Sequence, residues 1–149
     1  MMLYELVERL GRVRAFDVVA RPVSKKVAAA VRSRRVKDLL SGTWLGHPVH
    51  PMLTDVPIGA WASALVLDLA GGPHGRQAAD RLIGLGLATA LPTAVTGLSD
   101  WSDLVGEERR IGLLHAVANV SAVACYGLSL LARRRGARAR GLAWSLAGG

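Results

Sequence analysis

Three long apolar runs limit what this chain can fold into. They cover residues 53–71, 79–98 and 111–132, and the charged residues are concentrated outside them. Each run has about the 20 residues that an α-helix needs to cross roughly 30 Å of hydrocarbon. Hydrophobic residues make up 51% of the chain and its mean hydropathy is positive, which is not typical of a soluble basic domain. The sequence therefore predicts an all-α integral membrane helical bundle, a multi-pass protein of the cell membrane.

A fourth apolar run begins at Gly141 and has only nine residues. At the helical rise, nine residues cover about 14 Å, or half of a span. The prediction is three full transmembrane helices plus a truncated fourth over 141–149, which the parent protein is expected to complete. This transmembrane domain, residues 45–149, follows a separate N-terminal segment, residues 1–44.

The N-terminal segment is amphipathic and basic. Apolar residues recur at helical spacing from Leu3 to Val13, and Pro22 is expected to end this helix and to begin another that reaches Leu40. Such helices lie at the membrane interface, with their basic side chains against anionic lipid headgroups. Packing on another subunit or on a partner domain is an equally good interpretation.

The net charge of +8 does not indicate nucleic acid. Ten lysines and arginines precede the first apolar run and five more lie within residues 133–140. Basic residues at both ends of apolar runs are typical of membrane helices, where they orient the protein. We therefore expect the lipid bilayer, and no nucleic acid, as a partner.

The segment His47-Pro48-Val49-His50-Pro51, with Asp55 after it, carries ionisable groups into the start of the first span. Such groups are costly at the edge of a bilayer and indicate function. Alternating helix directions bring further groups to the same end of the bundle. The six groups predicted to share that end are His47, His50, Asp55, Asp100, Asp103 and His115.

Polar residues also follow one face of the second and third spans. The stripes comprise Thr89, Thr93, Thr96, Asp100 and Asp103 in the second, and His115, Asn119, Ala122, Tyr126 and Ser129 in the third. Because lipid cannot satisfy polar groups, the stripes are expected to face each other or a cavity. Hydroxyls that only join helices are the plainer alternative. Asp68, at the opposite end, is expected to pair with Arg76 or Arg81.

Residues 45–61, with the His-Pro segment followed by Asp55-Val56-Pro57-Ile58-Gly59, resemble the start of the membrane proteins grouped as domain of unknown function 2231. Residues 96–103 and 114–119 resemble its later motifs. The resemblance implies a four-helix membrane domain, which in some members continues into a Rieske iron-sulfur domain. This chain has no Cys-x-His pair, so a Rieske domain would be a continuation or a partner.

Two functions fit these patterns. The first is a membrane anchor or packing module for a redox partner. The alternative is an electron-transfer module, in which His47 or His50 faces His115 across a haem b, near Arg109 and Arg110, or in which the six groups hold a non-haem metal ion. No catalytic motif occurs, so the chain is not expected to be an enzyme by itself, although it would suit a component of a membrane oxidoreductase.

Overall fold

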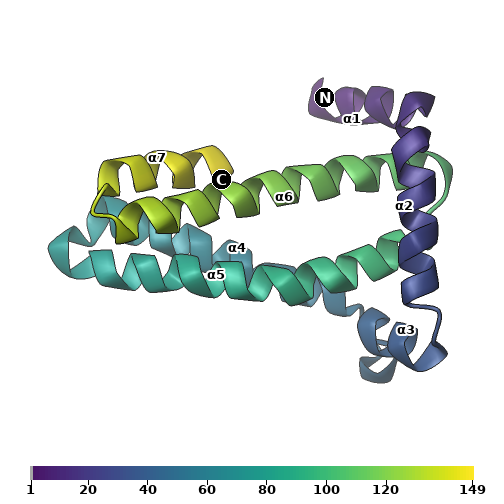
Figure 1. The fold of residues 1–149 in the computed structure, drawn as a ribbon, viewed down its shortest axis with the longest axis horizontal. Helices are drawn as coiled ribbons and strands as arrows, with labels where there is room; N and C mark the ends of the chain where they lie inside the picture. The colour runs from purple at the N-terminus through teal and green to yellow at the C-terminus, as the bar shows by residue number, and fades with distance from the viewer. Residues whose placement is uncertain (1) are drawn as a thin grey trace. The chain divides into compact units, whose positions relative to one another are not determined.

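The computed structural model describes residues 2–149, with side chains from Glu5 onward, and over this range it consists of helices and their connections. The three longest helices are α4 (Val49–Ala70), α5 (Gly72–Trp101) and α6 (Gly106–Arg134) (Figure 1). All three are long and apolar enough to cross a membrane. The predicted all-α membrane fold is therefore confirmed.

Each span is longer than its apolar run. Helix α4 begins four residues before the predicted start at 53 and includes Pro51, whose missing N–H matters least in a first turn. Only Gly71 separates α4 from α5, and the following Gly72 has φ +56°, a left-handed conformation that favours glycine. Helix α6 begins just after the α5–α6 turn, residues 102–105.

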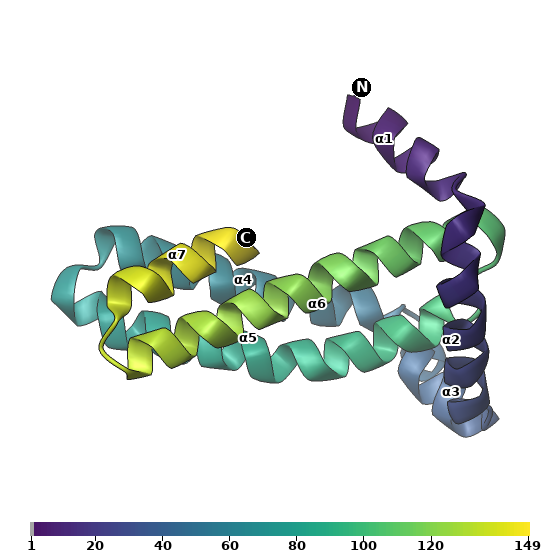
Figure 2. The same ribbon diagram turned by 45° about the horizontal axis from the view of Figure 1, so that its top comes forward.

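The run after α6 forms α7 (Arg138–Gly148), which folds back along α6 (Figures 1 and 2). The Ser129 hydroxyl of α6 donates to the Gly141 carbonyl at 2.7 Å and lies 2.8 Å from the Ser145 hydroxyl of α7. These buried contacts attach a helix that is shorter than a span to the end of α6.

The N-terminal segment contains α1 (Met2–Gly11), α2 (Asp17–Ala30) and α3 (Arg34–Ser41), with 3-10 turns at Arg14–Phe16 and Thr43–Leu45. The expected break at Pro22 is wrong, because Pro22 lies inside α2 and the chain turns at residues 12–16 and 31–33 instead. A proline inside a helix removes one hydrogen bond. Burial of Ala20 and Ser24 on the inner face of α2 offsets that loss.

The chain divides into two compact units. The first comprises the residues up to His50 together with Ala94–Ala118, and the second comprises Pro51–Thr93 and Asn119–Gly149. Within the first unit, α2 lies across the adjacent ends of α5 and α6 in both ribbon views. Within the second, Trp61 stacks on Tyr126 with ring centroids 4.1 Å apart, beside the buried Ile83.

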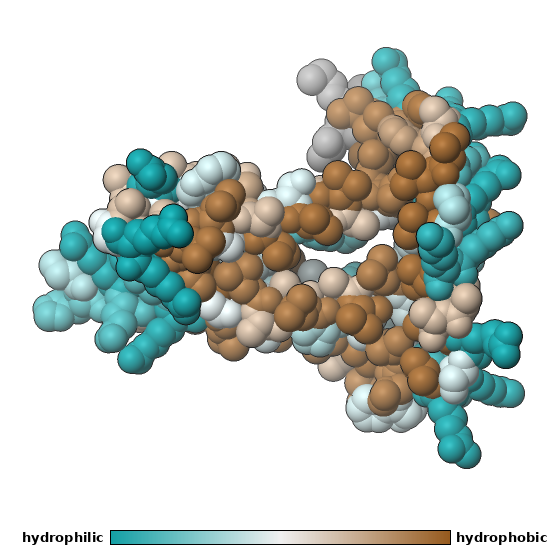
Figure 3. Space-filling model, in the orientation of Figure 1, coloured by the Kyte–Doolittle hydropathy of each residue, from teal (hydrophilic) through white to brown (hydrophobic). Residues whose placement is uncertain are grey.

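Large apolar side chains remain exposed along the spans, among them Val66, Leu69, Leu91 and Val120 at 62–70%. Lipid chains are as apolar as these side chains, so such exposure has no cost within a bilayer. In the second unit, the hydrophilic surface gathers at the end that carries the α4–α5 and α6–α7 connections (Figure 3). This distribution agrees with spans whose long sides face lipid.

Candidate functional site

Five of the six predicted ligands belong to the first unit: His47, His50, Asp100, Asp103 and His115. Asp55 lies in the second unit and is exposed. Among residues 2–149 the structure contains no group of three or more His, Cys, Asp or Glu side chains placed to hold a metal ion. The haem and metal assignments stay predictions.

His50 lies in the first turn of α4 and its ring rests on α5. A Cβ atom at Gly97 would fall 2.6 Å from Cε1 of this ring, so glycine is needed for the close approach. The ring nitrogen Nδ1 is 3.4 Å from the Thr96 hydroxyl. His50 also interacts electrostatically with Asp100, one turn further along α5. The imidazole therefore contributes to the contact between two spans.

The other two histidines of the first unit are exposed. His47 lies in the loop before α4, where its Nδ1 is 3.2 Å from the Pro48 carbonyl oxygen. His115 lies on α6. Asp103, also exposed, lies in the α5–α6 turn, where it pairs with Lys37.

Two threonines of the α5 stripe contact α4, Thr93 directly at the backbone and Thr96 at His50. Thr93 is buried and its hydroxyl donates to the Leu53 carbonyl of α4 at 3.2 Å and to the Thr89 carbonyl at 2.8 Å. Thr89 donates to Leu85 within α5 at 2.9 Å. In α6, Asn119 is exposed, whereas Tyr126 is buried against Trp61 of α4. These contacts match the plainer interpretation, in which polar side chains join helices.

Asp17, at the start of α2, forms the first of two clamps that attach the N-terminal helices to the adjacent ends of α5 and α6. Arg110 of α6 donates to both of its carboxylate oxygens, at 3.1 and 3.3 Å, and also to the Gly11 carbonyl at 2.7 Å. Both side chains are only 12% exposed. These hydrogen bonds, together with the charges of Arg110 and Arg21, hold the pKa of Asp17 below its ordinary value, although partial burial opposes them. Sequence reasoning considered Arg110 for haem propionates and missed this pair.

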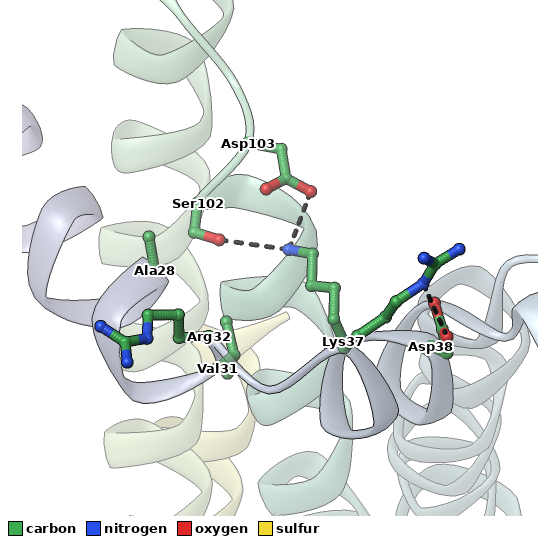
Figure 4. A pocket seen from close by; sticks show the side chains of 8 residues that line it. Ala28, Val31, Arg32, Lys37, Asp38, Ser102 and Asp103 are labelled. Atoms are coloured by element: carbon green, nitrogen blue, oxygen red, sulfur yellow. Dashed lines mark hydrogen bonds and ion pairs between the residues drawn. The ribbon is translucent and has the colours of Figure 1, made fainter.

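Lys37 of α3 forms the second clamp, at the end of α5. Its Nζ donates to the Ser99 carbonyl at 2.5 Å. It also lies 2.8 Å from the Asp103 carboxylate and 3.3 Å from the Ser102 hydroxyl (Figure 4). The last carbonyls of a helix have no partner within the helix and carry its negative dipole end, so a lysine there is stabilising. Beside Lys37 is a hollow of about 270 Å³ between α2, α3 and the turn, whose lining includes Arg32 and Ser102.

The second unit contains a buried ionic cluster that joins α4, α5, α6 and α7. Arg133 is fully buried and donates to Asp68 through both terminal nitrogens, at 2.9 and 2.5 Å, and to Asp80 at 3.1 Å. Arg138 donates to the same two carboxylates at 2.6 and 3.1 Å. Two carboxylates and two guanidiniums balance in charge.

This cluster corrects the predicted pairing of Asp68. Its guanidinium partners are Arg133 and Arg138, and not Arg76 or Arg81. Arg76 and Arg81 are near Asp68 in the sequence, but the Asp68 side chain is only 3% exposed and needs donors from the helices that pack around it. Asp68 and Arg133 are 65 residues apart, so no local pattern signals the contact.

The helices α4 to α7 that carry these contacts match a known protein family. The family described as predicted membrane protein (DUF2231) matches residues 46–149. The chain belongs to this family. The DUF2231 region covers α4 to α7 and begins at the loop that carries His47, whereas the two clamps involve Asp17 and Lys37 outside it. No curated protein and no solved structure matches the chain.

Proposed function

We propose that this DUF2231 protein is a membrane-anchoring module that holds a helical platform along one membrane surface. The platform is the segment α1–α3, residues 2–41. The observation that carries the proposal is the pair of clamps: Asp17 at the start of α2 pairs with Arg110 near the start of α6, and Lys37 of α3 pairs with Asp103 of the α5–α6 turn. A segment attached at two points near the ends of apolar helices is positioned at the membrane interface.

Exposed apolar side chains on the platform support this placement. Val36 and Leu39 of α3 are 41% and 60% exposed, and Trp44 after it is 65% exposed. Exposure of these apolar side chains to water is energetically unfavourable. At an interface they enter the boundary between headgroups and acyl chains, where tryptophan is also enriched.

A depth measurement tests the platform. Leu39→Cys places a label on the apolar side of α3, and Arg34→Cys places one about 140° around the same helix, at a side chain that is 95% exposed. Both are made in a Cys125→Ser background and labelled with an environment-sensitive fluorophore in phosphatidylcholine vesicles. We expect lipid-bound quenchers to act on the label at 39 and aqueous iodide to act on the label at 34. Equal quenching by iodide at both positions would contradict the proposal.

A second candidate function is electron transfer, in which the same membrane module binds a cofactor or a redox partner. Its support is that His47, His50 and His115 belong to one compact unit together with Asp100. Axial imidazoles bind haem iron, and resemblance to the family implies a Rieske domain as a partner. Purified protein titrated with haem b would show a shifted Soret band that His50→Ala and His115→Ala abolish. A spectrum of free haem at every ratio would contradict the cofactor form and leave the anchor unaffected.

A further inference from the structure

The platform has a surplus of positive charge on its outward side. Nine lysines and arginines between residues 9 and 35 are exposed, and only three of them reach a carboxylate: Arg12, Arg21 and Arg34. Glu8, Glu107, Asp17 and Asp38 are the acids used in these pairs. Among the described residues the other six form no ion pair: Arg9, Arg14, Lys25, Lys26, Arg32 and Arg35.

Helix geometry shows on which side of α2 these cations lie. Ala20 and Ser24 define the inner face of α2, since both are buried and the Ser24 hydroxyl donates to the Ser102 carbonyl of the α5–α6 turn. At 100° per residue, Lys25 is about 100° from Ser24 and Lys26 is about 160° from it. In Figure 3 the hydrophilic side chains of α2 and α3 project on the side away from the α5 and α6 segments of this unit.

We infer that Lys25 and Lys26 form an outer basic face that docks an acidic surface of a soluble protein, and that Arg32, exposed in the connection after α2, adds to its charge. This inference rests on the proposed platform, because spans within a bilayer place the bilayer on the inner side of α2 and water on its outer side. The headgroups of the protein's own membrane are therefore on the wrong side for these cations. Exposed Val18, at 78%, and Val19, at 53%, add an apolar contribution that a protein partner would cover.

A charge-reversed variant with a matched control tests the docking face. The variant K25E/K26E/R32E reverses three exposed cations that form no ion pair in either clamp. The control R134E/R135E/R140E makes the same change in net charge at three exposed arginines of the second unit, outside the buried cluster. Full-length protein in phosphatidylcholine nanodiscs is titrated with fluorescent poly-L-glutamate, which is an acidic polypeptide of defined chemistry.

We expect wild type and control to bind poly-L-glutamate with a salt-dependent Kd, and the outer-face variant to bind about tenfold more weakly or worse. Equal binding by the variant, or an equal loss in the control, would overturn the inference. Tighter binding of polyuridylate, or of phosphatidylserine vesicles added in solution, would also overturn it in favour of nucleic acid or lipid. If charge reversal prevents folding, K25Q/K26Q/R32Q carries the same test with half of the charge change.

The accessibility of position 25 to a water-soluble reagent distinguishes an incorrect docking face from an incorrect platform. Lys25→Cys in the Cys125→Ser background is treated with a membrane-impermeant maleimide. Labelling without binding of poly-L-glutamate would refute the acidic partner and retain the platform. A Lys25→Cys protein that labels only after detergent is added would refute the outward orientation and the platform together.

Discussion

At the scale of single residues, Arg133 and Asp68 form the least exposed ion pair among the described residues. Arg133 and Asp68 are 0% and 3% exposed, whereas Lys37 and Asp103, which also pair, are 25% and 64% exposed. Removing one partner of a buried ion pair leaves an uncompensated charge, but an exposed pair contributes little.

We therefore expect Asp68→Asn to destabilise the protein by about 3–5 kcal/mol and Asp103→Asn by less than about 1 kcal/mol. Asparagine keeps the size of the side chain, so the difference reports charge. The free energy of unfolding in mixed micelles, from denaturant titration followed by tryptophan fluorescence, measures both. Similar losses in the two variants would mean that Asp68 is hydrated and the cluster open.

The Asp17 clamp predicts a pH dependence. Arg110 lowers the pKa of the folded-state carboxyl, so its contribution to stability is complete above the unfolded-state pKa, which is about 3.9. It is lost as the pH falls through the folded-state value. We expect the difference in unfolding midpoint between wild type and Asp17→Asn to be constant from pH 7 to about pH 5 and to shrink below about pH 4. A difference that grows on acidification would contradict the pair.

At the scale of elements, the sequence predicts helices better than their ends and partners. Run length alone located three spans, because a bilayer imposes that length. The helix break predicted at Pro22 is absent, because a proline is only a local signal. Packing of the buried Ala20 and Ser24 supports α2 across this position. The spacing of polar residues predicts the α5 stripe correctly as one face of a helix. Spacing does not indicate which helix packs against that face, and the structure shows that Thr93 donates to α4.

The contact between α4 and α5 at His50 gives a prediction of its own. Gly97→Ala would place a Cβ atom 2.6 Å from the imidazole, and such overpacking costs roughly 1–3 kcal/mol. Gly84→Ala on the same helix meets nothing within 4 Å and, since alanine favours helix, is expected to be neutral or stabilising. The midpoints of thermal unfolding of both variants in detergent, compared with that of the wild type, test this prediction. An unchanged midpoint for Gly97→Ala would show that His50 moves aside without cost.

At the scale of the whole molecule, membrane insertion and platform attachment have separate physical causes. Insertion depends on the three apolar spans, which all lie within the DUF2231 region. Platform attachment depends on side chains that join the N-terminal segment to the adjacent ends of α5 and α6 and to the turn between them. The His-Pro segment was recognisable from its residues, but the clamps were not, since Asp17 and Arg110 are 93 residues apart.

Deletion of residues 2–41 separates these two causes. The shortened protein should remain in the membrane pellet after carbonate extraction, because all three spans are intact. It should also unfold at a lower temperature than the full chain, since Arg110 loses the Asp17 carboxylate while only 12% exposed, and the end of α5 loses Lys37. A double variant, Asp17→Asn with Lys37→Met, should reproduce most of that loss in the full-length chain. Release of the shortened protein into the supernatant would show that the platform is needed for insertion itself, and the separation argued from the clamps would be wrong.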